Sequence, residues 1–189
     1  DVTAVGGDLG VKTQVAGFGV VVGGGVLNFA NLQFAPVPTG GARGNSTETR
    51  GAAVYAEKYN LVRGFLELSA AVAELPVTAY FEGVHNQHPS EQNEGYLVGV
   101  CVGKLKEVGD WSFSTDYRDV DADATVAIFG ESDTGDGGTA IRTSRYVLGH
   151  QLAQGTAAYV HYSQAAQRDN AGGVETDFER IMLDLVYSF

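Results

Sequence analysis

The last twelve residues of the chain, FERIMLDLVYSF (178–189), restrict its fold more than any other segment. Apolar side chains stand at every second position, namely Ile181, Leu183, Leu185, Tyr187 and Phe189. Because a β-strand turns alternate side chains to opposite faces, the pattern predicts a strand with one apolar face and one mixed, partly charged face. The segment ends on an aromatic residue. This is typical of a membrane barrel, whose lipid-facing side ends in an aromatic girdle at the interface.

Composition agrees with a barrel and argues against several other classes. Charged residues make up 19% of the 189 residues, whereas about 25% is usual for a soluble domain. Mean hydropathy is −0.05, as expected where a polar lumen offsets an apolar exterior. The formal charge of −11 argues against nucleic acid as a partner, because phosphate binding needs clustered Lys and Arg.

The sequence predicts neither an enzyme nor a cofactor or metal site. The single cysteine, Cys101, excludes an internal disulfide and a cysteine-based metal cluster. No P-loop, dinucleotide fingerprint or G-x-S-x-G motif is present. Ser163 and His161 share a predicted strand face, but they lack the motif of a hydrolase. We expect His85 and His88 to be solvated, because this polar loop offers no third metal ligand.

Nine extended segments recur along the chain, separated by clusters of Gly, Asn, Asp and Ser. The clearest of the internal ones runs from Trp111 to Tyr117, where apolar and polar residues alternate. The segments 9–22 and 26–36 are predicted to pair around a turn at Gly23–Gly25. The segment 57–73 is predicted to be a strand, although its Ala, Glu and Leu content would also suit part of a helix.

The connections between these segments alternate between short and long. The short ones are Gly23–Gly25, Glu74–Pro76, Lys106–Asp110 and Ala153–Gly155, and the long polar ones are 37–52, 86–94, 120–140 and 167–177. Membrane barrels have short periplasmic turns and longer extracellular loops, so the first and the last strand would both run towards the periplasm. A closed bacterial barrel normally has an even number of strands. Either one strand is missed, or residues 1–189 are a single β-barrel domain that is incomplete at its N-terminal end, and we favour the second interpretation.

Five segments carry a resemblance to a known family: 23–33 (GGGVLNFANLQ), 44–47 (GNST), 74–86 (ELPVTAYFEGVHN), 94–133 and 178–189. The fourth is the most specific, with a glycine-rich strand, a Lys-x-Lys turn, a Gly-Asp-Trp restart and Tyr-Arg before Asp-Ala-Asp-Ala. Together they resemble the Putative porin family of proteobacterial outer membranes. The resemblance implies an all-β, antiparallel transmembrane barrel in the outer membrane of a Gram-negative bacterium. Members look longer than this chain, and a porin of about 16 strands would leave an aqueous channel.

Charged residues alternate with the apolar stripes and are therefore predicted to line the pore. These candidates are Glu82, Asp116, Arg118, Arg180 and Asp184. Such charges can set the ion preference of a constriction, or they can simply solvate the lumen and pair across strands. The net charge gives only a weak expectation of cation preference, because the loops carry much of it.

The segment 119–138 is acidic and encloses the apolar stretch Ala124–Phe129. An apolar patch in a long loop suggests that the loop folds inward as a constriction. The candidate constriction residues are Asp121, Asp123, Phe129, Glu131 and Asp133. The alternatives are a solvated acidic loop and a Ca²⁺ site, although the spacing does not match an EF-hand.

Four aromatic residues fit a girdle, where a ring needs one apolar and one wet edge: Trp111, Tyr117, Tyr187 and Phe189. Tyr187 and Phe189 also resemble the C-terminal signal that the outer-membrane assembly machinery recognises. The alternative is a soluble β-sandwich core, but a sandwich usually has evenly short loops and more Pro.

The sequence therefore predicts a porin through which small polar solutes or ions diffuse passively, with no catalytic residue. Its expected partners are outer-membrane lipid, the assembly machinery and the solutes themselves, and a homo-oligomer is left open. The alternative is a structural barrel with a plugged lumen, serving as a subunit of a larger envelope complex. Nine strands closed on themselves would favour that alternative, because about eight strands fill their own interior with side chains.

Overall fold

The computed structural model of the chain describes residues 1–39, 41–129, 138–168 and 175–188. The strands are β1 (Thr3–Val15), β2 (Phe18–Ala30), β3 (Thr47–Arg50), β4 (Ala52–Tyr55), β5 (Tyr59–Val72), β6 (Leu75–Asn86), β7 (Glu94–Gly103), β8 (Trp111–Val120), β9 (Ile141–Ala153), β10 (Thr156–Arg168) and β11 (Glu175–Tyr187). One 3-10 helix, η1, covers Ala127–Phe129. None of the described residues forms a helix long and apolar enough to cross a membrane.

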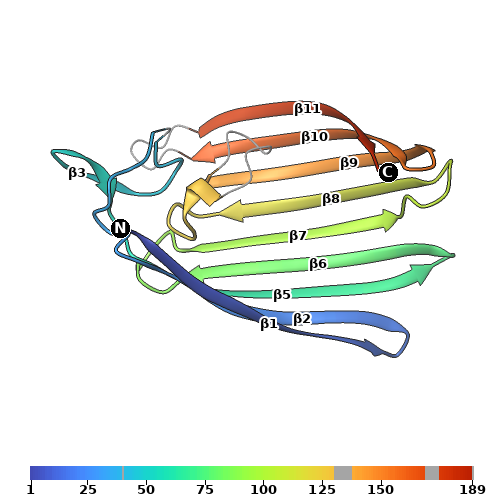
Figure 1. Cartoon of the computed structure of the whole chain (residues 1–189), viewed down its shortest axis with the longest axis horizontal. Helices are drawn as coiled ribbons and strands as arrows, with labels where there is room; N and C mark the ends of the chain where they lie inside the picture. The colour runs from blue at the N-terminus through green and yellow to red at the C-terminus, as the bar shows by residue number, and fades with distance from the viewer. Residues whose placement is uncertain (40, 130–137, 169–174, 189) are drawn as a thin grey trace.

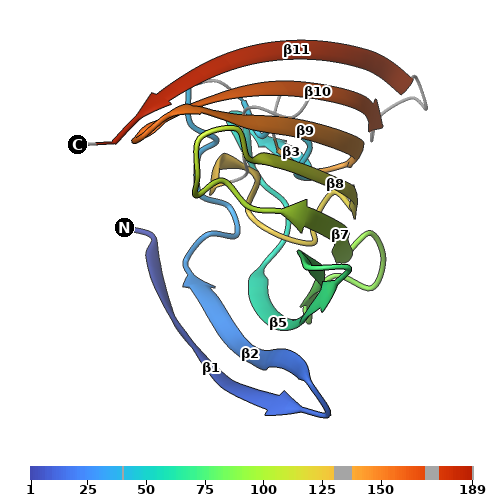
Figure 2. The same ribbon diagram turned by 90° about the vertical axis from the view of Figure 1, so that its right-hand side faces the viewer.

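Nine of these strands form one antiparallel sheet in the order β1-β2-β5-β6-β7-β8-β9-β10-β11, while β3 and β4 form a separate hairpin (Figure 1). The predicted all-β antiparallel class is confirmed, and the segment 57–73 is a strand. The sheet curls into a trough, and its two edge strands are β1 and β11 (Figure 2). Among the described strands, β1 pairs only with β2 and β11 only with β10. The sheet is therefore open, and the predicted closure into a barrel stays a prediction.

The first turn lies at Ala16 and Gly17, not at Gly23–Gly25 as the sequence predicted. Both turn residues, Ala16 and Gly17, have positive φ, 50° and 87°, as a type I′ hairpin turn requires. The glycine run lies inside β2 for a packing reason. A Cβ added at Gly23 would overlap both the ring of Phe65 and the backbone of Leu9 and Gly10, so close packing and not a turn requires glycine there.

Short and long connections lie at opposite ends of the sheet. The two-residue links at 16–17, 73–74 and 154–155 and the link 104–110 lie at one end, and the connections 31–58, 87–93 and 121–140 lie at the other. We call these the short-turn end and the long-loop end. The alternation predicted from the sequence is present in the described connections.

The pairing register gives the sheet two chemically different faces, because residues directly opposite each other in an antiparallel ladder point the same way. On what we call the outer face lie the large exposed apolar side chains of the strands, with Val186 as the exception. The other face, here called the inner face, holds most of the charged side chains. At the long-loop end it is covered by a cluster of Phe29, Leu32, Tyr55, Tyr59, Leu61 and Val126.

Candidate pore wall and inward loop

All five predicted pore-lining residues lie on the inner face. Asp116 is in register with Tyr80 through Gly99 on one side, and with Arg180 through Arg145 and Ser163 on the other. A parallel row joins Glu82 to Arg118 through Leu97. Asp184 lies opposite Tyr159, four residues along β11 from Arg180. The register therefore brings these residues together on one surface that runs across the sheet.

Contacts between charged or polar side chains cross between strands on this face. The Arg145 guanidinium lies 2.8 Å from the Asp116 carboxylate, whose side chain is only 2% exposed. His161 Nε2 lies 3.0 Å from Asp184 Oδ2. Arg63 holds Asp8 with two hydrogen bonds, one from its Nε at 2.6 Å and one from its Nη2. The sequence alone missed Arg63, Arg145 and Asp8, because the faces of their segments could not be assigned without the register.

The inner face of the described strands is balanced in charge. It carries five bases (Lys12, Arg63, Arg118, Arg145 and Arg180) and five acids (Asp8, Glu67, Glu82, Asp116 and Asp184). The sum is 5 − 5 = 0, so the net charge of −11 resides elsewhere on the chain. The composition therefore gives no support to a cation preference of the wall as a whole.

Aromatic rings on the inner face lie across glycines of the neighbouring strand. A Cβ at Gly99 would overlap the ring of Tyr80, and one at Gly149 would lie 2.9 Å from Cε1 of Tyr159. The ring of Phe65 lies over Gly23 in the same way. Because glycine has no Cβ, each ring can lie flat against the backbone of the neighbouring strand, and the space above the inner face stays open.

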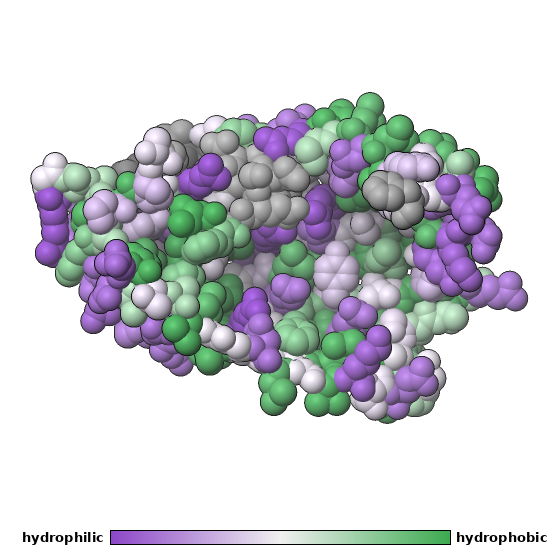
Figure 3. Space-filling view, in the orientation of Figure 1, coloured by the Kyte–Doolittle hydropathy of each residue, from purple (hydrophilic) through white to green (hydrophobic). Residues whose placement is uncertain are grey.

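A hollow of about 660 Å³ lies on the inner face towards the long-loop end, and the space-filling view shows that face sunken at its centre (Figure 3). The walls of the hollow combine charged side chains with apolar ones. Its lining includes Arg63, Glu82, Arg118, Phe65, Leu97 and, from the segment after β8, Thr125.

The segment after β8 folds inward over the long-loop end, and Ala122, Ala124, Val126 and Ala127 are buried there. Asp123 is buried and accepts hydrogen bonds from Tyr59 OH at 2.6 Å and from Ser46 N at 3.0 Å. This carboxylate is therefore bound by the protein itself. Of the other candidates, Glu131 and Asp133 lie outside the described residues.

The two remaining constriction candidates differ in their surroundings. Asp121 lies 3.4 Å from Arg168 Nη1 and accepts a hydrogen bond from Glu94 N at 3.2 Å. Phe129 is 71% exposed and stacks on Phe29 with 5.7 Å between ring centroids. Within the part of the chain that the structure describes, no group of three or more His, Cys, Asp or Glu could hold a metal ion.

Aromatic side chains mark two levels on the outer face. Trp111 and Tyr187 lie near the short-turn end. The Trp111 ring stacks on the His150 ring, with 4.0 Å between the ring centroids. Tyr117 lies six residues further along β8, which corresponds to about 20 Å of strand, close to the height of a membrane barrel's apolar band. The ring of Tyr96 lies beside that of Tyr117, with 6.1 Å between the ring centroids. The fourth candidate, Phe189, lies outside the described residues.

Comparison with known proteins gives one match. The sequence model of a family described as Putative porin matches residues 58–189, which include β5 to β11 and the inward segment. The chain belongs to this family. No curated protein and no solved structure matches the chain. Membership supports a porin-like role at a general level and suggests an outer-membrane location in a Gram-negative bacterium.

Two asparagines hold the inward segment of this family member, and the sequence alone gave neither of them a role. The Nδ2 of Asn45 donates to Ala122 O at 2.6 Å and Thr125 O at 2.8 Å, and its Oδ1 accepts from Ala127 N at 2.8 Å. Asn86 is fully buried and donates to Asp123 O at 2.9 Å. Their one sequence signal is that both lie in segments that carry the resemblance, GNST and ELPVTAYFEGVHN.

Proposed function

We propose that this chain forms part of the wall of an outer-membrane pore through which small polar solutes or ions diffuse passively. One observation carries the proposal, namely the division of the sheet into an apolar outer face and a charged inner face. Ile181, Leu183 and Leu185 on the outer face are 70–76% exposed. Such side chains would be stable against lipid, and the charged face would be stable against a water-filled lumen.

The proposed roles of the residues follow from their faces. Glu82, Asp116, Arg118, Arg180 and Asp184, with the arginines that pair across strands, would keep the lumen hydrated. The segment 121–129 would narrow the long-loop end, because it lies over the inner face there. Trp111, Tyr117 and Tyr187 would contact lipid at the interfaces, and Tyr187 with Phe189 would be read by the assembly machinery.

Strand direction bears on how the wall closes. Nine antiparallel strands leave β1 and β11 running the same way, from the long-loop end to the short-turn end. Unpaired backbone groups in hydrocarbon cost several kcal/mol each, so both edges need partners. A second copy in the same membrane orientation would offer only its own edge strands, β1 and β11, which run in that same direction. Pairing with them would therefore be parallel. We therefore propose that an odd number of further strands lies between the two edges, giving an even barrel of about 16 strands.

Conductance in planar bilayers tests the proposal. The native full-length protein should give stable conductance steps in KCl, and the heat-unfolded protein should give none. Absence of conductance from protein that is folded and inserted would contradict pore function.

A plugged structural barrel is the second candidate, and one observation favours it. The apolar cluster around Tyr55, Tyr59 and Val126 fills part of the long-loop end. In a plugged barrel, deletion of the inward segment 121–129 should create conductance that the intact protein lacks. In an open porin the same deletion should only enlarge the existing steps.

A further inference from the structure

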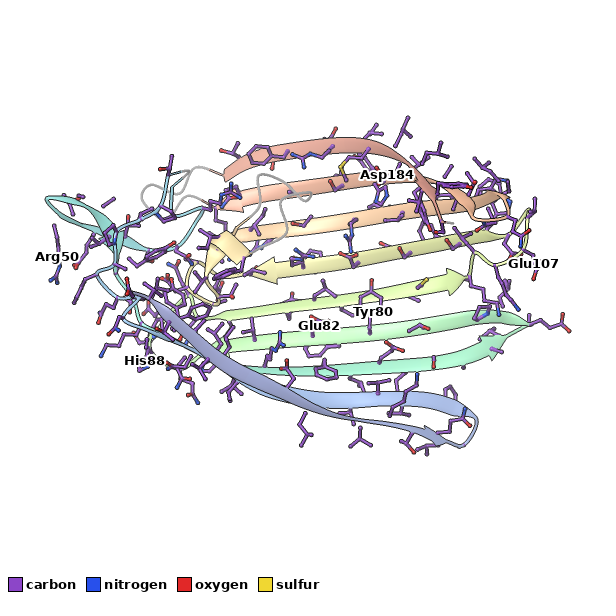
Figure 4. All side chains as sticks on the ribbon, in the orientation of Figure 1. Arg50, Tyr80, Glu82, His88, Glu107 and Asp184 are labelled. Carbon is purple, nitrogen blue, oxygen red and sulfur yellow. The ribbon has the colours of Figure 1, made fainter. Side chains whose placement is uncertain are left out.

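Four side chains on the inner face of β5 and β6 form an alternating pattern of rings and carboxylates. Phe65 lies directly opposite Glu82, and Glu67 lies directly opposite Tyr80. Each carboxylate therefore has an aromatic ring across from it and another two positions away on its own strand. We call these four residues the aromatic–carboxylate patch. Tyr80 and Glu82 follow each other along the middle of β6 (Figure 4).

The two rings lie along the wall and do not stand upright from it. Phe65 lies over Gly23, and its Cζ would be 3.1 Å from a Cβ added at Gly10. Tyr80 lies over Gly99 on the other side of the patch. A ring that lies against the backbone turns one face to the lumen, and the face of an aromatic ring attracts cations.

The carboxylates of the patch are exposed, and neither takes part in an ion pair among the described residues. Arg63 lies diagonally across the strand pair from Glu82, but its guanidinium is held by two hydrogen bonds to Asp8. Lys12 is separated from Glu67 by Val21 of the intervening strand. The patch is therefore an acidic area within an inner face whose charges balance only when they are summed over the whole face.

Phe65 and Glu82, the half of the patch nearer the long-loop end, open into the hollow of about 660 Å³. Beside them the hollow is lined by the apolar Leu61, Val84 and Leu97 and by the charged Asp8, Arg63 and Arg118. A carboxylate and a ring face beside apolar walls match an organic cation that has an apolar part. We propose that the patch binds organic ammonium ions carrying an apolar group, as a site on the permeation path. This inference rests on the proposed pore function and names a solute class for it.

Metal cations and anions fit the patch less well. Glu67 and Glu82 are only two carboxylates, whereas Ca²⁺ takes about six to eight oxygen ligands, and the described residues contain no group of three or more His, Cys, Asp or Glu that could hold a metal ion. An anion in the hollow would meet the Glu82 carboxylate, and the neighbouring Arg63 is already held by Asp8. An ammonium group gains from both the carboxylate and the ring.

Block of the KCl conductance by three probes of similar size tests the inference: benzyltrimethylammonium, benzyl alcohol and benzoate. We expect the cation to block the native full-length protein at the lowest concentration. The Glu82→Gln and Glu67→Gln variants, and Phe65→Leu, should each raise its half-blocking concentration about threefold to tenfold. The matched control is Glu179→Gln, which removes a carboxylate from the outer face and should leave the block unchanged.

The outcomes separate this inference from the pore function itself. If the protein conducts and all three probes block it equally, the inference is overturned. The same holds if the patch variants do not change the block by benzyltrimethylammonium. In both cases the proposed pore function remains supported. If the protein does not conduct, calorimetric titration of the detergent-solubilised protein with benzyltrimethylammonium decides. Binding that Glu82→Gln weakens supports the site, and absence of binding overturns it.

Discussion

At the scale of single residues, glycines on the inner face have a structural task that the composition does not show. Gly99 and Gly23 lie under aromatic rings, so their lack of a Cβ sets where Tyr80 and Phe65 can lie. The same residues in a sequence suggest turns, and this is why the first turn was misplaced. The turn at Ala16 and Gly17 carries a weaker local signal than the run Gly23–Gly25.

The Gly99→Ala variant tests this task. Its new methyl group would displace the Tyr80 ring from the wall, so we expect a loss of about 1 kcal/mol in the free energy of unfolding, measured by urea titration. Gly64→Ala is the matched control, because the nearest atom to its added Cβ is 3.8 Å away. In a Tyr80→Ala background the Gly99→Ala cost should disappear. An equal loss in both backgrounds would show that the ring is not the cause.

At the scale of elements, the inward segment is held mainly by hydrogen bonds to its backbone. Asn45, which lies in another long connection, binds three backbone groups of residues 122–127. Asp123 adds bonds to Tyr59 and Ser46. The apolar stretch Ala124–Phe129 predicted that this loop would turn inward, and Val126 is part of the buried cluster there. The partners of the loop could not be predicted, because they lie about 80 residues away, as the Asn45 to Thr125 bond shows.

The Asn45→Ala variant should release the inward segment. It leaves buried backbone groups of residues 122–127 without partners, at a cost of about 2–4 kcal/mol. We expect faster proteolysis within residues 121–129 of the membrane-inserted protein and noisier single-channel traces. The control is Asn28→Ala, since Asn28 lies exposed on the outer face of β2. Unchanged cleavage in Asn45→Ala would contradict an anchoring role.

At the scale of the whole molecule, the open question is what lies between β1 and β11. Direct closure would make a parallel seam, whereas every pair within the sheet is antiparallel. Nine strands closed on themselves would also leave little lumen, since about eight strands are filled by their own side chains. Pore function and further strands are therefore linked proposals.

Thiol cross-linking tests the seam in the membrane-inserted full-length protein with Cys101→Ser as background. Val160→Cys with Leu183→Cys places two thiols directly opposite each other on β10 and β11, and a short bifunctional reagent should join them. Val11→Cys with Leu183→Cys places one thiol on each edge strand, and we expect no intramolecular link because further strands separate them. Efficient linking of this second pair would support a nine-stranded barrel and contradict the larger one.

The sequence by itself determined the elements whose side chains alternate over enough residues to define two faces. The terminal strand and the strand that begins at Trp111 are the clearest cases, because period-two alternation is a local property of the chain. It also determined that short and long connections alternate, and it placed five charged residues on one face. These features depend only on neighbours in the sequence.

Only the tertiary structure decided which of those side chains meet. The pairing of Asp116 with Arg145, the ring of Tyr80 over Gly99 and the aromatic–carboxylate patch each depend on the register between strands. A shift of one residue in any strand would turn its whole set of side chains to the other face, and the sequence of a single strand does not fix its partner's position. The register is set when the sheet forms, by the packing of both faces together.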